Sequence, residues 1–149
     1  MRDRDVRNAM QAALAATGAF DAVWLWGLPE AHGSGASRLA IATIEPVSSV
    51  QDDRWDSAAT GSLVVTSQVA ITLLARHEDP QTRDENAELL LDVVANALNG
   101  QSLAGFTIPE LTRLASWRWS PPSAPERRVE AIFGYQYIVD FWNSYDLTP

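Results

Sequence analysis

The sequence contains no cysteine in its 149 residues. This absence excludes disulfide bonds, thiol nucleophiles and metal sites with cysteine ligands, and it fits a protein made in a reducing cytosol. No apolar run approaches the roughly 18 residues that cross a bilayer, and the first ten residues lack the apolar core of a signal peptide. We therefore expect a soluble protein with no membrane partner.

Basic residues are scarce relative to acids. Eleven Lys plus Arg stand against nineteen Asp plus Glu, and the formal net charge is −8. Surfaces that bind nucleic acid neutralise phosphates with basic side chains, so we expect no specific nucleic-acid binding. At this length one domain buries roughly two thirds of its unfolded surface, so residues 1–149 are predicted to form a single domain.

Familiar catalytic motifs are also missing. The sequence has no GxSxG, GxxxxGK[ST] or HExxH pattern, and no GxGxxG after a strand. Neighbouring carboxylates such as Asp52 and Asp53 can perform acid–base chemistry, but adjacent acids in a polar segment are usually solvated. The two histidines, His32 and His77, lack a third convergent metal ligand. We therefore expect no enzyme, no cofactor and no metal site.

The chain does contain a series of amphipathic segments. In chain order the pattern predicts a helix over 3–17, strands over 22–27 and 38–46, a long polar loop over 47–61, a strand over 63–76, a helix over 80–99, and strands over 114–120 and 127–142. Asp3 or Asp5 is the expected cap of the first helix. The first two strands are compatible with a loose hairpin, and the last two with an antiparallel pair.

Two features of these elements are more specific. Apolar residues at helical spacing mark the buried faces of the helices: Val6, Met10, Ala13 and Leu14 in the first, and Ala87, Leu90, Leu91, Val94 and Leu98 in the second. The strand over 63–76 would span roughly 45 Å, which is longer than a small sheet needs. We therefore expect one end of it to project as an arm.

The stretch LLARHEDPQT (73–82) places His77, Glu78 and Asp79 side by side. Such a group can be a catalytic or metal-binding cluster, or the punctuation between two elements. Asp79 immediately precedes Pro80, which is the pairing expected for an N-cap and a first helical residue. A metal site would need about three convergent ligands, which the sequence does not supply. The pattern favours a capping role for Asp79.

Aromatic residues are abundant in the last third of the chain. Trp117 and Trp119 share one strand face, and the strand over 127–142 is partly apolar on both faces. One domain with two thin helices has difficulty covering both faces, so a subunit contact is the economical explanation. We therefore predict a homo-oligomer, with these candidate interface residues: Trp117, Trp119, Phe133, Tyr135, Tyr137, Phe141 and Trp142.

The order of elements resembles that of a known family. The stretches DVRNAMQAAL, SLVVTSQVAITLLARHEDPQTRDENAELLLDVVANALNG and RRVEAIFGYQYIVDF carry the similarity. In pattern they resemble the small tail terminator or tail-completion proteins of long-tailed bacteriophages, over nearly the whole chain. The resemblance implies an α/β (α+β) fold, with a mixed, mainly antiparallel sheet flanked by two main helices.

The same resemblance implies a structural role in the virion. The chain would form a ring of six copies at the head-proximal end of the tail tube, end tube polymerisation and present the surface that docks to the head. Its partners would be the tail tube protein and a head–tail connector or neck protein, after assembly in the host cytoplasm. The family offers no catalytic residues and no cofactor.

The acidic segment near Trp55 has two interpretations. Asp52, Asp53 and Asp56 can line the passage for the genome, where carboxylates would repel phosphate, or they can form a solvated outer loop. Two other functions stay open for the whole chain. One is a neck or head-completion protein. The other is a cytoplasmic α/β domain that binds a small molecule in a pocket lined by Trp24, Trp26, Trp117 and Trp119.

Overall fold

The computed structural model describes residues 2–27, 40–57, 62–121 and 125–140; of residues 51–57, 62, 63 and 140 it describes the backbone. The described strands are β1 (Ala22–Trp24), β2 (Ala40–Ser57), β3 (Ser62–Arg76), β4 (Arg113–Trp119) and β5 (Glu126–Asp140). They form one sheet in the order β1-β2-β3-β5-β4. β1 runs parallel to β2, and all other neighbours are antiparallel.

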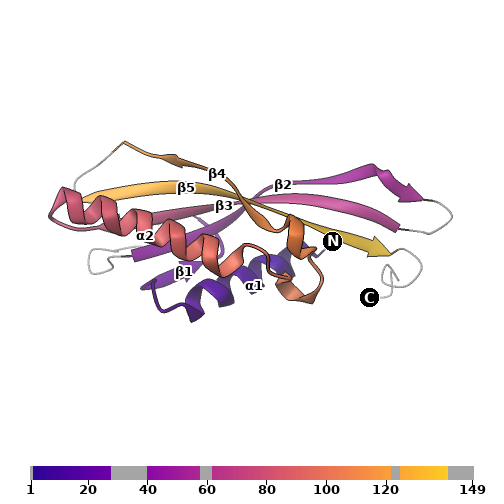
Figure 1. Ribbon diagram of the computed structural model, residues 1–149, viewed down its shortest axis with the longest axis horizontal. Helices are drawn as coiled ribbons and strands as arrows, with labels where there is room; N and C mark the ends of the chain where they lie inside the picture. The colour runs from indigo at the N-terminus through magenta and orange to yellow at the C-terminus, as the bar shows by residue number, and fades with distance from the viewer. Residues whose placement is uncertain (1, 28–39, 58–61, 122–124, 141–149) are drawn as a thin grey trace.

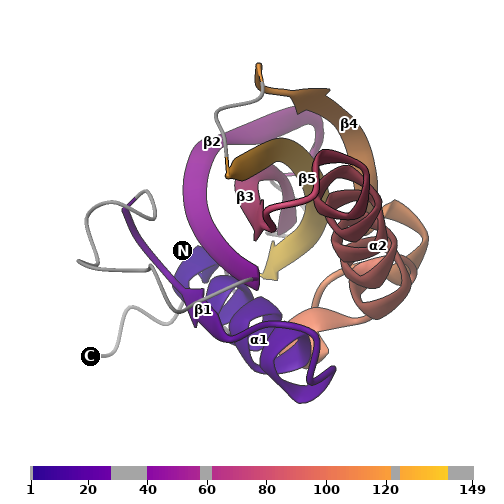
Figure 2. The ribbon, with the colours of Figure 1, turned by 90° about the vertical axis from the view of Figure 1, so that its left-hand side faces the viewer.

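Two α-helices accompany the sheet: α1 (Asp3–Ala16) and α2 (Pro80–Leu98). Two short 3₁₀ turns, η2 (Leu103–Gly105) and η3 (Pro109–Leu111), link α2 to β4. Figures 1 and 2 show a strongly twisted sheet with both helices packed on one side of it. The predicted fold class, a mixed and mainly antiparallel sheet flanked by two helices, is confirmed.

The core lies between the helices and one face of the long strands. α1 buries Val6, Met10 and Leu14, as its apolar spacing predicts. α2 buries every apolar residue predicted for its inner face, together with Arg83. Alternate residues of the strands complete the cluster: Val65, Val69, Ile71 and Leu73 from β3, and Val129, Ala131, Phe133, Tyr135, Tyr137 and Val139 from β5.

Two expectations about the first half of the chain are wrong. β1 and β2 do not form a hairpin, because they pair in parallel, with Ala22 opposite Ile41. The stretch 47–61 is not a long loop, because β2 continues to Ser57 along β3. The stretch lacks a strand period because its described side chains, Val47 to Val50, are all exposed, so no face needs to be apolar. Two irregularities, between Pro46 and Ser48 and between Asp52 and Ser57, further disturb the alternation.

Of the two predicted helix N-caps, the one for α2 is correct and the one for α1 is wrong. Asp79 caps α2: its Oδ2 accepts hydrogen bonds from the Thr82 N–H at 3.0 Å and the Thr82 hydroxyl at 2.7 Å. These bonds from Thr82 lower the pKa of Asp79. His77 belongs to the same turn, since its Nδ1 accepts from the Asp79 N–H at 2.9 Å. In α1, by contrast, Arg2 is the N-cap residue without a side-chain bond, and Asp3 lies inside the helix.

We expect Asp79→Ala to lower the thermal unfolding midpoint by a few degrees, because the first turn of α2 loses its side-chain acceptor. Glu78→Ala is the matched control, since Glu78 is an equally exposed acid one residue earlier. Calorimetry of the two variants checks this prediction. Equal midpoints for both variants would contradict the capping role.

Candidate assembly surface

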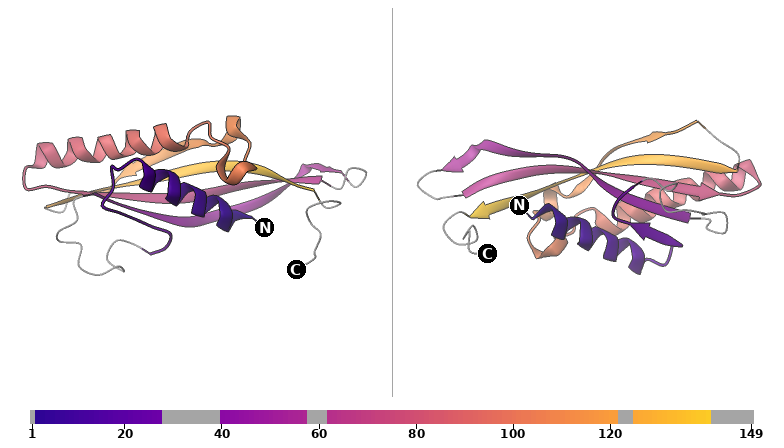
Figure 3. Two further views of the ribbon diagram at one scale, coloured as in Figure 1. Left: turned by 90° about the horizontal axis from the view of Figure 1, so that it is seen from below. Right: turned by 180° about the vertical axis from the view of Figure 1, so that it is seen from behind.

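The long strands extend beyond the helices that cover them. β3 has 15 residues and spans roughly 50 Å, whereas the 19 residues of α2 span roughly 28 Å. Figures 1 and 3 show β2, β3 and β5 continuing past the N-terminal end of α1. We call this projecting part the arm: residues 50–57 of β2, 62–66 of β3 and 136–140 of β5. The projection expected from the length of β3 is therefore present.

A polar cluster fixes α1 at the base of the arm. The Asp3 carboxylate accepts hydrogen bonds from Tyr135 at 2.6 Å, Ser67 at 2.8 Å, Ser49 at 3.1 Å and Tyr137 at 3.2 Å. The two serine oxygens also lie 2.9 Å apart. Because these hydroxyls come from β2, β3 and β5, one carboxylate joins the first turn of α1 to three strands. We call these five residues the Asp3 cluster.

The protonation states of the cluster suit this role. Burial alone would raise the pKa of the Asp3 carboxyl, but the hydrogen bonds from the four hydroxyls outweigh it and hold the pKa below its ordinary value. Burial and the neighbouring carboxylate raise the pKa of Tyr137 to about 12, and they also raise the pKa of Tyr135. Asp3 is therefore the charged acceptor and the tyrosines are neutral donors over a wide range of pH.

Sequence patterns did not predict the Asp3 cluster, although the sequence of β3 contains an indication of it. Ser67 interrupts the alternating apolar residues of β3, between Val65 and Val69, and it is 1% exposed. A buried polar side chain needs a hydrogen-bond partner, so a hydroxyl at that position implies a polar group on the element that covers it. Asp3 is that group.

The sheet has two open backbone edges within the described residues. β1 pairs only with residues 41–43 of β2, so the outer edge of β2 from Ile44 to Ser57 faces no described strand. β4 is the other outermost strand. At its start the Leu114 N–H donates to Asn99 Oδ1 at 2.7 Å, and the outer edge from Ser116 to Trp119 faces no described strand. The corresponding edge of β5 is partly covered, because Thr107 bridges to Tyr137. Unpaired strand edges are templates for pairing with another chain.

Exposed apolar side chains accompany these edges. Val50 is 60% exposed and Ile138 is 55% exposed. Their pairing partners are Thr66 and Val64, so both lie on the face of the arm opposite the core. On β4, Trp117 is 55% exposed. Apolar groups at a sheet edge are typical of surfaces that meet another subunit.

The candidate interface residues divide into three groups. Phe133, Tyr135 and Tyr137 are at most 1% exposed, so their assignment to a subunit contact is wrong: they face the helices and belong to the core of this chain. Trp119 is half-buried, with the Arg127 guanidinium 5.2 Å from its ring centre. Trp117 is the exposed one. Phe141 and Trp142 lie outside the described residues.

The three aspartates proposed for the passage lie on the arm. Asp52 pairs with Val64 in the ladder of β2 and β3, and Asp53 and Asp56 follow along β2 towards its end at Ser57. Their backbone is therefore part of a strand rather than a loop, and their side chains lie outside the described part of the structure.

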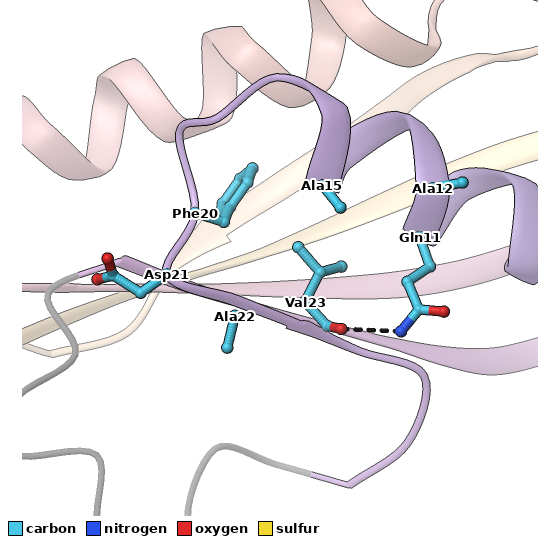
Figure 4. A pocket seen from close by; sticks show the side chains of 7 residues that line it. All are labelled: Gln11, Ala12, Ala15, Phe20, Asp21, Ala22 and Val23. Atoms are coloured by element: carbon cyan, nitrogen blue, oxygen red, sulfur yellow. Dashed lines mark hydrogen bonds between the residues drawn. The ribbon is translucent and has the colours of Figure 1, made fainter.

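The tryptophan-lined pocket is not formed. Trp24 is on β1, and Trp117 and Trp119 are on β4, at the opposite edge of the sheet. A depression of about 330 Å³ does lie between α1 and β1, lined mainly by small apolar side chains (Figure 4). Its two polar side chains are already engaged: Gln11 donates to the Val23 carbonyl at 2.9 Å, and Asp21 accepts from the Ala40 N–H at 2.9 Å.

The described residues lack two other kinds of feature. No group of three or more His, Asp or Glu there is placed to hold a metal ion. No helix among them has the length and apolarity to span a membrane. The geometry that stands out is therefore the arm, its open edges and the cluster at its base.

Comparison with known proteins finds similarity of fold alone. No family model and no curated protein matches the sequence. Among solved structures, the chain is similar to the sheath/tube terminator of an extracellular contractile injection system in its extended state, with a TM-score of 0.52, 18% identity, and coverage of 91% of this chain and 55% of that one. This similarity is one of fold. It spans about half the length of that terminator.

A second similar structure is a chain from the virion of a native gene transfer agent particle. The TM-score is 0.41 at 18% identity, and the match covers 87% of this chain and 84% of that chain.

We expect Phe133→Ala and Trp117→Ala to behave oppositely. Phe133→Ala should lower the free energy of unfolding by about 3–5 kcal/mol, because it leaves a cavity in the core. Trp117→Ala should change it by no more than about 0.5 kcal/mol, because the side chain is largely exposed. Denaturant unfolding of both variants checks this. A large loss for Trp117→Ala would show that it packs within the chain.

The Asp3 cluster predicts a pH-dependent stability. Since folding lowers the pKa of Asp3, its contribution is present above the unfolded pKa near 3.8 and is lost as the pH falls through the folded pKa. Asp3→Asn should therefore lower the free energy of unfolding by about 1.5 kcal/mol at neutral pH, a low value because the carboxylate keeps contact with solvent.

Urea unfolding from about pH 7 down to about pH 2 measures this difference. It should shrink as the pH falls from about 3.8, the unfolded pKa, through the lower folded pKa, below which the wild-type carboxyl is also neutral. Asp5→Asn is the control, an exposed acid in the same turn of α1. A difference between wild type and Asp3→Asn that does not change with pH would contradict the role of the charged carboxylate.

Proposed function

We propose that this protein terminates a phage-type tail tube. Copies of the chain form a ring, of six subunits, at the head-proximal end of the tube, where the ring ends tube polymerisation and offers a docking surface for the head. The observation that carries the proposal is the similarity of nearly the whole described fold to a sheath/tube terminator. The role is structural rather than catalytic, it needs no cofactor, and residues 1–149 act as one domain.

The arm supports an assembling function independently. A protein that acts alone blunts or covers its long strand edges, because an exposed edge recruits other chains. Within the described residues, β2 is open from Ile44 to Ser57 and β4 from Ser116 to Trp119. Trp117, Val50 and Ile138 add exposed apolar area beside these edges. Such edges and side chains suit a subunit that is completed by its neighbours.

The partners follow from the position in the particle. One surface of the ring meets the tail tube protein, and the other meets a head–tail connector or neck protein. The mature location is therefore the head-proximal end of the virion tail, after assembly in the host cytoplasm. The acidic balance of the chain suits a ring around a genome passage, because carboxylates near the passage repel phosphate. Asp52, Asp53 and Asp56 on the arm are the candidates for that lining.

The assembly state tests this proposal. Light scattering of the purified protein should give about 98 kDa, six times the 16.3 kDa of one chain, in solution or once tail tubes are added. The same ring should not bind duplex DNA tightly at physiological salt. A protein that stays monomeric at high concentration and does not assemble on tubes would contradict the ring, and tight DNA binding would contradict the acidic passage.

The position in the particle needs a separate measurement. A gold-labelled antibody against this chain should mark the end of the tail next to the head in electron micrographs of intact particles. Label at the portal side of the neck would instead favour a neck or head-completion protein. Tails released from heads distinguish the two, because a terminator stays with the tail.

A further inference from the structure

We propose that neighbouring copies in the ring join edge to edge, with β4 of one subunit pairing with the open edge of β2 of the next. This inference rests on the ring proposed above and identifies the surfaces that close it. The contact is heterologous, because it uses two different edges of the same chain, and only a heterologous contact generates a ring of more than two copies.

Strand direction is the first argument. β2 and β3 are antiparallel, β3 and β5 are antiparallel, and β5 and β4 are antiparallel, so β2 and β4 run in opposite directions. Copies related by rotation about an axis roughly parallel to the strands keep these strand directions. β2 of one copy therefore meets β4 of the next as an antiparallel pair, which is the more stable arrangement of two strands.

Both edges have a regular stretch to pair. β2 is regular from Ser48 to Asp52, between its two irregularities, and lies beyond the three residues covered by β1. β4 is regular from Ser116 to Trp119. Ser48 and Val50 on one edge, and Ser116 to Arg118 on the other, are all exposed.

The face of the sheet restricts the register. Trp117 pairs with Ala131 and therefore faces the core side, whereas Arg118 pairs with Glu130 and faces the opposite side. Val50 faces that opposite side, as its partner Thr66 does. Since paired residues share a face, Arg118 can lie opposite Val50 or, two positions along, Ser48, but Trp117 cannot lie opposite Val50.

The geometry of a closed ring agrees with these registers. The strand pairings carry each position onto β5. Val50 corresponds to Gln136 and Ser48 to Gly134, whereas Arg118 pairs directly with Glu130. The offset is therefore six or four residues, roughly 20 or 13 Å. Four inter-strand spacings, roughly 19 Å, separate β2 from β2 of the next copy. These offsets correspond to strand tilts of about 46° or 35°, and closed sheets have tilts of about 35–45°.

Charge favours the same pairing. β4 contains Arg113 and Arg118 and no acid. The Arg118 guanidinium lies 3.6 Å from the Glu130 carboxylate of β5, yet the Arg118 side chain is 80% exposed. The open stretch of β2, residues 44–57, contains four acids and one arginine. Opposite charges on adjacent strands stabilise the pair, and the like charges of two β2 edges or two β4 edges oppose a twofold contact.

Cysteine cross-linking tests the contact against a background without native cysteine. The Cα separations of antiparallel pairs, about 4.5 or 5.5 Å, both allow a disulfide. Under mild oxidation, Val50→Cys/Arg118→Cys or Ser48→Cys/Arg118→Cys should give a ladder of linked oligomers up to the full ring. Val50→Cys/Trp117→Cys is the matched control, and it should give none because its two side chains face opposite sides.

The outcomes separate this inference from the proposed function. A ring of the expected mass without cross-links in either Arg118 pair would overturn the edge contact and leave the terminator role standing. Linked dimers from Val50→Cys alone would show a twofold contact and overturn the edge pairing. A protein that never assembles and never cross-links overturns both proposals.

A charge reversal provides a second measurement. Arg118→Glu should raise the concentration for half-assembly by about tenfold or more, because like charges then meet across the edge. Arg4→Glu is the control, with the same change of charge at an exposed position of α1, outside both strands. Equal effects of the two variants would overturn the specific role of β4.

Discussion

The arrangement of the fold depends on the hydrogen bonds that the ionised Asp3 carboxylate accepts. In the arm β2 and β5 end and β3 begins beyond the helices, and the first turn of α1 is the helical structure nearest to it (Figure 3). Asp3 accepts hydrogen bonds there from hydroxyls of β2, β3 and β5. Hydrogen bonds to a charged acceptor are stronger than those between two neutral groups, and they fix the direction of the side chain as well as its distance. α1 and the base of the arm are therefore held as one unit.

Beyond that cluster, the sheet offers more strand than the chain can cover. The core face of β5 is filled by residues such as Phe133, but of the two described α-helices only the first turn of α1 contacts the base of the arm. Within the described residues, the edge of β2 beyond Thr43 and the edge of β4 from Ser116 pair with no strand. Irregularities near Pro46 and Asp52 limit the regular stretch of the β2 edge. Interruptions of this kind restrict promiscuous edge pairing and leave a short, specific site. The same feature that makes the monomer incomplete thus makes an ordered assembly possible.

The sequence predicted local elements well and surfaces poorly. Both helices, the cap at Asp79 and the pairing of β4 with β5 follow from periodicity and turn chemistry. The main error is the assignment of the aromatic residues of β5 to a subunit interface. An apolar residue at a strand position fits a core and an interface equally well, so alternation alone assigned Phe133 and Trp117 to one surface, whereas one is buried and the other 55% exposed.

The sequence by itself determined the helices, the long β3, the acidic balance and the absence of cysteine chemistry, because each depends on neighbouring residues or on composition. Only the tertiary structure decided that β1 pairs in parallel, that polar residues after Pro46 extend β2, and that Asp3 points into the sheet. These are contacts between residues far apart in the chain. Exposed strand residues need no apolar period when a partner strand supplies their hydrogen bonds, and no local pattern records which partner that is.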